Sequence, residues 1–165
     1  MMSYDNFTKK IQNAIDICSY PFFVVQQDKK KQCTCVEDST MQPNPNCKKC
    51  LGTGYKVKMK IVKGASNEEM KTGGATMSAK TSRVIKNYYL KDDYNIEQDN
   101  YIIDNNELYY VYRKRHMKGI KNEFTHTEIT ASLHVNDYDI ILKNCLEVIN
   151  KNLPKKKRCD FPWLK

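Results

Sequence analysis

The stretch "CTCVEDSTMQPNPNCKKCLGTGYKVKMKIV", residues 33–62, joins four clustered cysteines directly to a run of alternating side chains. In that run apolar residues alternate with lysines: Tyr55, Val57, Met59 and Ile61 against Lys56, Lys58 and Lys60. A period of two is typical of a β-strand with one buried and one solvated face. The stretch therefore predicts a β protein that carries a cysteine-rich insertion at residues 32–54.

The cysteines Cys33, Cys35, Cys47 and Cys50 have the spacing C-x-C-x11-C-x2-C. Two close pairs joined by a long loop can bring four thiolates to tetrahedral distance around one ion. In a reducing compartment, this spacing indicates a metal more often than a disulfide. We therefore predict a structural Zn²⁺ site, with chance clustering and a redox role as the alternatives. Because four thiolates leave no open coordination position, we do not expect this metal to catalyse a reaction.

The chain has 165 residues, of which 40% are hydrophobic and 28% charged, so we expect one globular domain. Its net charge of +9 suggests a polyanionic partner, although a solvated lysine-rich surface would give the same charge. No apolar run approaches the roughly 20 residues that cross a bilayer, and "MMSYDNFTKK" lacks the apolar stretch of a secretory signal. We expect no membrane association and a protein made in a cytosol.

The rest of the chain predicts an antiparallel meander between two helices. Apolar spacing indicates an amphipathic helix over residues 3–18 and a second one from Asn136 or Asp137, as the N-cap, to about residue 153. Strands are expected at "FFVVQQ", "SRVIKNYYL", "NYIID", "LYYVYRKRHM" and residues 127–135, with "DNNE" as a hairpin turn. The predicted class is mainly β with terminal helices (α+β), as a small antiparallel barrel or sandwich.

Two segments fall outside this pattern. Residues 63–80, "KGASNEEMKTGGATMSAK", have no periodicity and are predicted to form a long mobile loop. Residues 154–165 form a basic C-terminal arm with an apolar tip of Phe161, Trp163 and Leu164. Since such side chains are costly to expose, we expect the arm to dock on a neighbouring subunit and hold an oligomer together, with packing on its own domain as the alternative.

Three other sequence features give less information about function. "CKKCLGTG", residues 47–54, resembles one C-x-x-C-x-G-x-G unit of the zinc region of J-domain cochaperones, which implies a turn geometry and not chaperone activity. "GATMSAKT" departs from the phosphate-binding loop at Ala79 and precedes a predicted strand where that loop needs a helix. The basic clusters 29–31, 113–115 and 155–158 support only diffuse attraction to a polyanion.

From residue 55 onward, the chain resembles the small connector proteins that close the neck of tailed bacteriophages between portal and tail. The resemblance is carried by "YNIEQDNYIIDNNELYYVYRKRHMKG", with its strands and turns, and by "FTHTEITASL" before a terminal helix. It covers about residues 55–150, and the cysteine insertion departs from the simplest members.

This resemblance implies a nonenzymatic structural protein in the virion neck, assembled in the host cytoplasm as a homo-oligomeric ring. Its neighbours would be portal or adaptor and tail proteins, and double-stranded DNA would pass through the ring nonspecifically. By position, the 63–80 loop is the candidate for reaching into the DNA channel, with Lys63, Lys71 and Lys80 as contacts. The alternative is a zinc-ribbon nucleic-acid-binding regulatory protein, and an enzyme is the third hypothesis.

Overall fold

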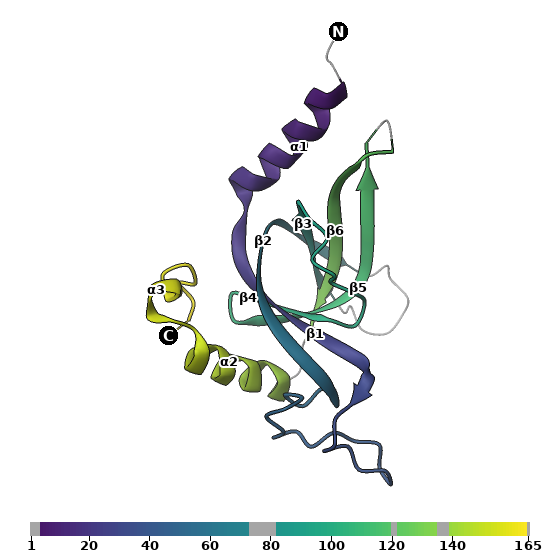
Figure 1. The fold of residues 1–165 in the computed structure, drawn as a ribbon, viewed down its shortest axis with the longest axis vertical. Helices are drawn as coiled ribbons and strands as arrows, with labels where there is room; N and C mark the ends of the chain where they lie inside the picture. Colours follow the sequence, from purple (N-terminus) through teal and green to yellow (C-terminus); the bar gives the residue numbers. More distant parts are fainter. Residues whose placement is uncertain (1–3, 73–81, 120–121, 135–138, 165) are drawn as a thin grey trace.

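The computed structural model describes residues 4–72, 82–119, 122–134 and 139–164. Six antiparallel strands form a closed barrel in the order β1-β2-β3-β6-β5-β4 (Figure 1). The strands are β1 (Tyr20–Gln32), β2 (Tyr55–Thr72), β3 (Ser82–Leu90), β4 (Tyr101–Asp104), β5 (Glu107–Lys118) and β6 (Phe124–Leu133). The helices are α1 (Tyr4–Cys18), α2 (Ile140–Asn152) and α3 (Lys155–Arg158). The predicted α+β class is confirmed, and the sheet is a barrel.

The inside of the barrel is filled by large apolar and aromatic side chains. Phe22 of β1, Tyr88 of β3 and Tyr109 of β5 are all 0% exposed. The rings of Phe22 and Tyr88 lie 4.8 Å apart, and those of Tyr88 and Tyr109 lie 6.2 Å apart. Ile129 and Ala131 of β6, two residues apart on the same strand face, belong to the same core. These side chains make the barrel a packed core and not a pore.

A second apolar core lies outside the barrel, where α2 and the C-terminal residues cover one wall (Figure 1). It joins outward-facing residues of β1, β2, β4 and β5 to Cys145 and Ile149 of α2. Asp139 caps α2 by accepting a hydrogen bond from the Leu142 backbone N–H at 3.0 Å. The predicted caps, Asn136 and Asp137, lie outside the described residues. Within the described part of the chain, no helix is both long and apolar enough to cross a membrane.

Part of the apolar face predicted for residues 55–61 lies against this outer core, whereas Ile61 is 38% exposed. Val57 and Met59 pack beneath α2, whereas Val62, one residue out of phase, enters the barrel. The lysines that alternate with them lie on the same face of β2 as Val62. At Lys58, which lies opposite Gln26 of β1 in the ladder, this face has passed the end of the barrel core. The period therefore predicted the strand correctly, but the buried side of its first half is the outside of the barrel.

The predicted 63–80 loop is wrong for its first part. Lys63 pairs with Pro21 of β1, and Lys71 pairs with Arg83 of β3, so β2 continues to Thr72. Lys80 and residues 73–81 lie outside the described residues. The strand changes partner at Gly64, where a Cβ would lie 2.5 Å from the Leu90 side chain and 2.9 Å from the Tyr89 carbonyl oxygen. A glycine is typical of such a barrel corner, which explains why this strand contains one.

The expectation that residues 154–165 form an arm docked on a neighbouring subunit is also corrected, in favour of the alternative of packing on their own domain. After Pro154 the chain forms the short helix α3 and then returns to the barrel wall. Phe161 is 1% exposed, and its ring stacks on Phe23 of β1 at 4.5 Å. Trp163 and Leu164 pack on the same core, and the Trp163 carbonyl accepts a hydrogen bond from Asn106 at 2.9 Å. The apolar tip is thus buried within its own chain, because the outer core offers it a site nearby.

Candidate metal centre

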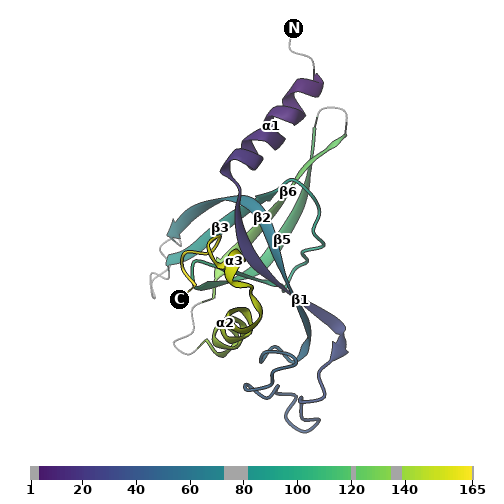
Figure 2. The same ribbon diagram turned by 60° about the vertical axis from the view of Figure 1, so that its left-hand side comes forward.

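The four predicted cysteines lie in the connection between β1 and β2, residues 33–54, which we call the cysteine lobe. β1 and β2 extend away from the barrel as a two-stranded ribbon, and the lobe forms its end (Figure 2). The register of the ribbon shifts between Asp28 and Gln32. The Cys33 backbone N–H then donates to the Gly54 carbonyl at 2.8 Å, which closes the base of the lobe.

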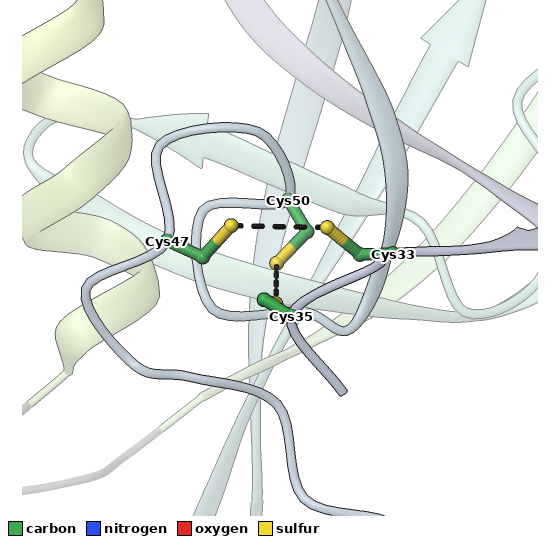
Figure 3. A group of neighbouring side chains, drawn as sticks. All are labelled: Cys33, Cys35, Cys47 and Cys50. Carbon is green, nitrogen blue, oxygen red and sulfur yellow. Dashed lines mark hydrogen bonds between the residues drawn. The ribbon is translucent and has the colours of Figure 1, made fainter. Parts of the chain in front are cut away.

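The four sulfurs point toward one another, although the two cysteine pairs are far apart in sequence (Figure 3). All four lie within 4.8 Å of one another, with Cys33 and Cys47 at 3.7 Å and Cys35 and Cys50 at 3.5 Å. A disulfide needs about 2.05 Å between its sulfurs, so these contacts are not disulfides. A tetrahedral ion with Zn–S bonds of about 2.3 Å places its sulfurs about 3.8 Å apart. The observed spacing is that of a group of thiolates that could hold one metal ion.

Backbone geometry around the second pair shapes the site. Leu51, Gly52 and Gly54 have φ angles of 56°, 88° and 82°, the region that glycine adopts without strain. The chain therefore curls around Cys50, and the backbone N–H groups of Gly52 and Gly54 donate to its sulfur. This turn, in which the two glycines point their amides at a ligand sulfur, is the local geometry of the "CKKCLGTG" stretch.

The surroundings of the lobe shift the pKa values of two neighbouring thiols in opposite directions. Backbone N–H donors, chiefly that of Cys50, lower the pKa of Cys47 to about 6. Desolvation raises the pKa of Cys35 to about 12. Four thiolates within 4.8 Å of one another would repel, so a cation is needed to hold them together in ionised form. The donor set, four sulfurs with supporting amides, is the one that soft and borderline metal ions such as zinc prefer.

The lobe is also packed against α2. Leu51, next to Cys50, is 3% exposed and belongs to the outer core together with Cys145 and Ile149. The Asn144 side chain donates to the Pro45 carbonyl at 2.8 Å. These contacts join the metal-ligand loop to the C-terminal helix, so order in the lobe and order in α2 are coupled.

One polar cluster in the barrel was not found by sequence reasoning. Asp104, 0% exposed, accepts hydrogen bonds from Lys86 at 2.7 Å, Tyr20 at 2.6 Å and Tyr88 at 3.2 Å. The Lys86 ammonium also lies 5.3 Å from the centre of the Tyr109 ring. Burial acts to lower the pKa of Lys86, but the hydrogen bond and charge of Asp104 outweigh it, and the pKa is raised. Lys86 therefore stays charged, and the pair is an internal ion pair of the barrel.

The chain was compared with known proteins. No protein-family model matches it, and no curated protein matches it. The fold and the cysteine lobe therefore carry the functional argument.

Proposed function

We propose that this protein is a structural, nonenzymatic component of the neck of a tailed bacteriophage particle. It would assemble in the host cytoplasm as a homo-oligomeric ring between portal or adaptor and tail proteins, with double-stranded DNA passing through the ring. The sequence resemblance over residues 55–150 motivates the proposal, and the closed barrel with flanking helices is compatible with it. Where the barrel closes, its strands are paired on both sides, so copies would associate there through helices and side-chain surfaces; the β1–β2 ribbon beyond the barrel is paired on one side only.

The observation that carries the ring hypothesis is the exposed apolar surface of α1. This helix projects from the barrel in both ribbon views (Figures 1 and 2). Ile15 anchors its C-terminal end at 7% exposure, but Phe7 and Ile17 are 55% and 83% exposed. The Gln12 side chain donates to the Thr125 carbonyl at 3.2 Å, so the helix is held in this projecting position. Apolar side chains on a fixed, projecting helix suit burial against a neighbouring copy.

In this proposal Cys33, Cys35, Cys47 and Cys50 bind one structural Zn²⁺. A zinc ion would supply folding free energy to the lobe, which has few apolar contacts of its own apart from Leu51. Metal analysis should find one zinc per chain. The matched variants are Cys50→Ser, which should lose the zinc, and Cys145→Ser in α2, which should keep it. Zinc retained by Cys50→Ser, or absent from the native protein, would contradict this assignment.

A zinc-stabilised nucleic-acid-binding regulator is the second candidate. The observation in its favour is that Lys48 and Lys49 lie inside the second cysteine pair, next to further lysines of the ribbon. Such a regulator would bind one short sequence more than ~10³-fold tighter than random DNA at physiological salt. A neck protein would show no such preference, because phosphate contacts attract without specifying sequence.

Mass photometry of the zinc-loaded protein tests the ring, alone and with its portal and tail partners. We expect a closed oligomer in at least one of these conditions, and its loss in the α1 variant Phe7→Ser. The control is Met41→Ser, which replaces a side chain that is 68% exposed on the cysteine lobe. A monomer under all conditions, or equal assembly of Phe7→Ser and the native protein, would contradict the role of α1 in the ring.

A further inference from the structure

Four lysines gather where the β1–β2 ribbon meets the cysteine lobe. One hollow on the ribbon is bordered by Lys31, Lys56 and Lys58, and a second, adjoining one by Lys31, Lys49 and Lys56. Lys31 and Lys56 are common to both hollows, so the two form one continuous surface. We call Lys31, Lys49, Lys56 and Lys58 the lysine face.

The lysine face keeps most of its charge unneutralised. Among the described residues, Lys49, Lys56 and Lys58 form no ion pair, and Lys31 is 3.6 Å from Asp28. Glu97, the other carboxylate at the first hollow, is held by Lys114 at 2.9 Å. The acidic groups near the face are therefore already paired.

The lysines of the ribbon are placed by the strand and not by the cysteines. In the strand register, Lys56 lies opposite Asp28 and Lys58 lies opposite Gln26. The two lysines are two residues apart, so both project from the same face of β2. Gln26 is fixed by hydrogen bonds to the carbonyls of Tyr94 and Asn95, at 3.2 and 2.6 Å, which makes this wall of the hollow rigid. Compensation of a zinc–thiolate charge would account for Lys48 and Lys49 inside the cysteine pair. It would also apply to Lys56, which borders the same hollow as Cys33, but not to Lys58, whose hollow contains no cysteine.

We propose that the lysine face is the surface with which this protein contacts the phosphate backbone of duplex DNA. The inference rests on the proposed place at a DNA channel, and it replaces the 63–80 segment as the candidate contact. Residues two apart on a strand lie about 6.6 Å apart, a spacing similar to that of successive phosphates along one strand. Among the described residues that border the two hollows, none is aromatic. The face thus offers charge without stacking, which suits backbone contact and no base readout.

Fluorescence anisotropy with a short, labelled duplex of mixed sequence tests the proposal. If four phosphates are contacted, log K should fall with log salt at a slope of about −3.6, or about 10²-fold between 50 and 200 mM salt. The variant Lys56→Gln/Lys58→Gln should halve this slope and weaken binding about 10-fold at the higher salt. The control Lys155→Gln/Lys156→Gln removes the same charge from α3 and should bind like the native protein.

Equal loss in both variants would mean diffuse attraction and would overturn the lysine face. Absence of binding by the native protein would overturn it too. Mass photometry of the same samples reports ring assembly independently, so a failed lysine face with intact rings leaves the neck proposal standing. Loss confined to Lys56→Gln/Lys58→Gln, with no rings either in these samples or with the portal and tail partners, would support the face and contradict the neck proposal. Circular dichroism and zinc content confirm that each variant is folded.

Discussion

Replacing Phe161 with alanine tests whether the C-terminal residues are part of the domain itself. Phe161 is 1% exposed, and its ring contacts Phe23 at 4.5 Å and Trp163 at 5.7 Å between centroids. Removing a buried phenylalanine ring costs about 3–5 kcal/mol, since apolar contact is lost and a cavity remains. Each aromatic pair adds about 0.5–1.5 kcal/mol beyond burial.

We therefore expect Phe161→Ala to lower the free energy of unfolding by about 4 kcal/mol. At about 2–4 °C per kcal/mol for a chain of this size, the melting temperature should fall by about 10 °C. Urea unfolding of the zinc-loaded monomer, followed by far-UV circular dichroism, measures the change. Trp163 is the only tryptophan of the chain, so its fluorescence reports the same event locally.

The matched control is Phe7→Ala on α1, where the ring is 55% exposed. Because the Phe7 ring buries little surface in the monomer, Phe7→Ala should change the free energy of unfolding by less than about 1 kcal/mol. If Phe161→Ala costs no more than Phe7→Ala, the C-terminal residues do not stabilise their own domain. An arm that docks on a neighbouring subunit would then be the better interpretation.

Three further predictions follow from the lobe and the core. At about pH 8, a thiol reagent should modify the exposed Cys18 and Cys159 of the zinc-loaded protein, and the lobe cysteines only after chelation. Cys145 should react only on unfolding, because burial raises its pKa to about 12; reaction of Cys145 in the native state would contradict its placement. Lys86→Met leaves Asp104 buried without its cation and should cost about 3–5 kcal/mol. The same change at Lys91, whose pair with Asp16 is exposed, should cost less than about 1 kcal/mol, and equal costs would refute the distinction. Chelation should raise amide hydrogen exchange in α2 as well as in residues 33–54, because Leu51 and Pro45 contact that helix; a change confined to the lobe would disprove the coupling.

Local sequence patterns predicted most of the helices and strands. The full length of β2 and the burial of Asp104 depend on contacts between residues far apart in the sequence. Residues 63–72 have no alternating sequence pattern, yet they form a strand because β1 and then β3 supply backbone partners. Asp104 was placed at the end of the expected strand "NYIID" and the start of the turn "DNNE", and it does end β4; its burial and its ion pair with Lys86, a residue of another strand, were not predicted. No local signal joins those two positions.

The cysteine site was predictable because its ligands lie within one loop and their spacing is itself the signal. How the lobe is seated was not, since the contact between Asn144 and Pro45 joins residues 99 positions apart. The apolar tip of the C-terminal residues was misassigned for the same reason. Composition indicates that Phe161 and Trp163 must be covered, but only the fold shows that Phe23 of the same chain covers Phe161.

The most direct test of the proposed function is electron cryomicroscopy of the assembled tailed particle, purified with its portal and tail. We expect a ring of this six-stranded barrel in the neck, with α1 against the neighbouring copy and metal density among the four cysteine sulfurs. Particles whose neck contains no density that fits the barrel would contradict it. So would a protein that remains outside the particle, bound to one short nucleic-acid sequence.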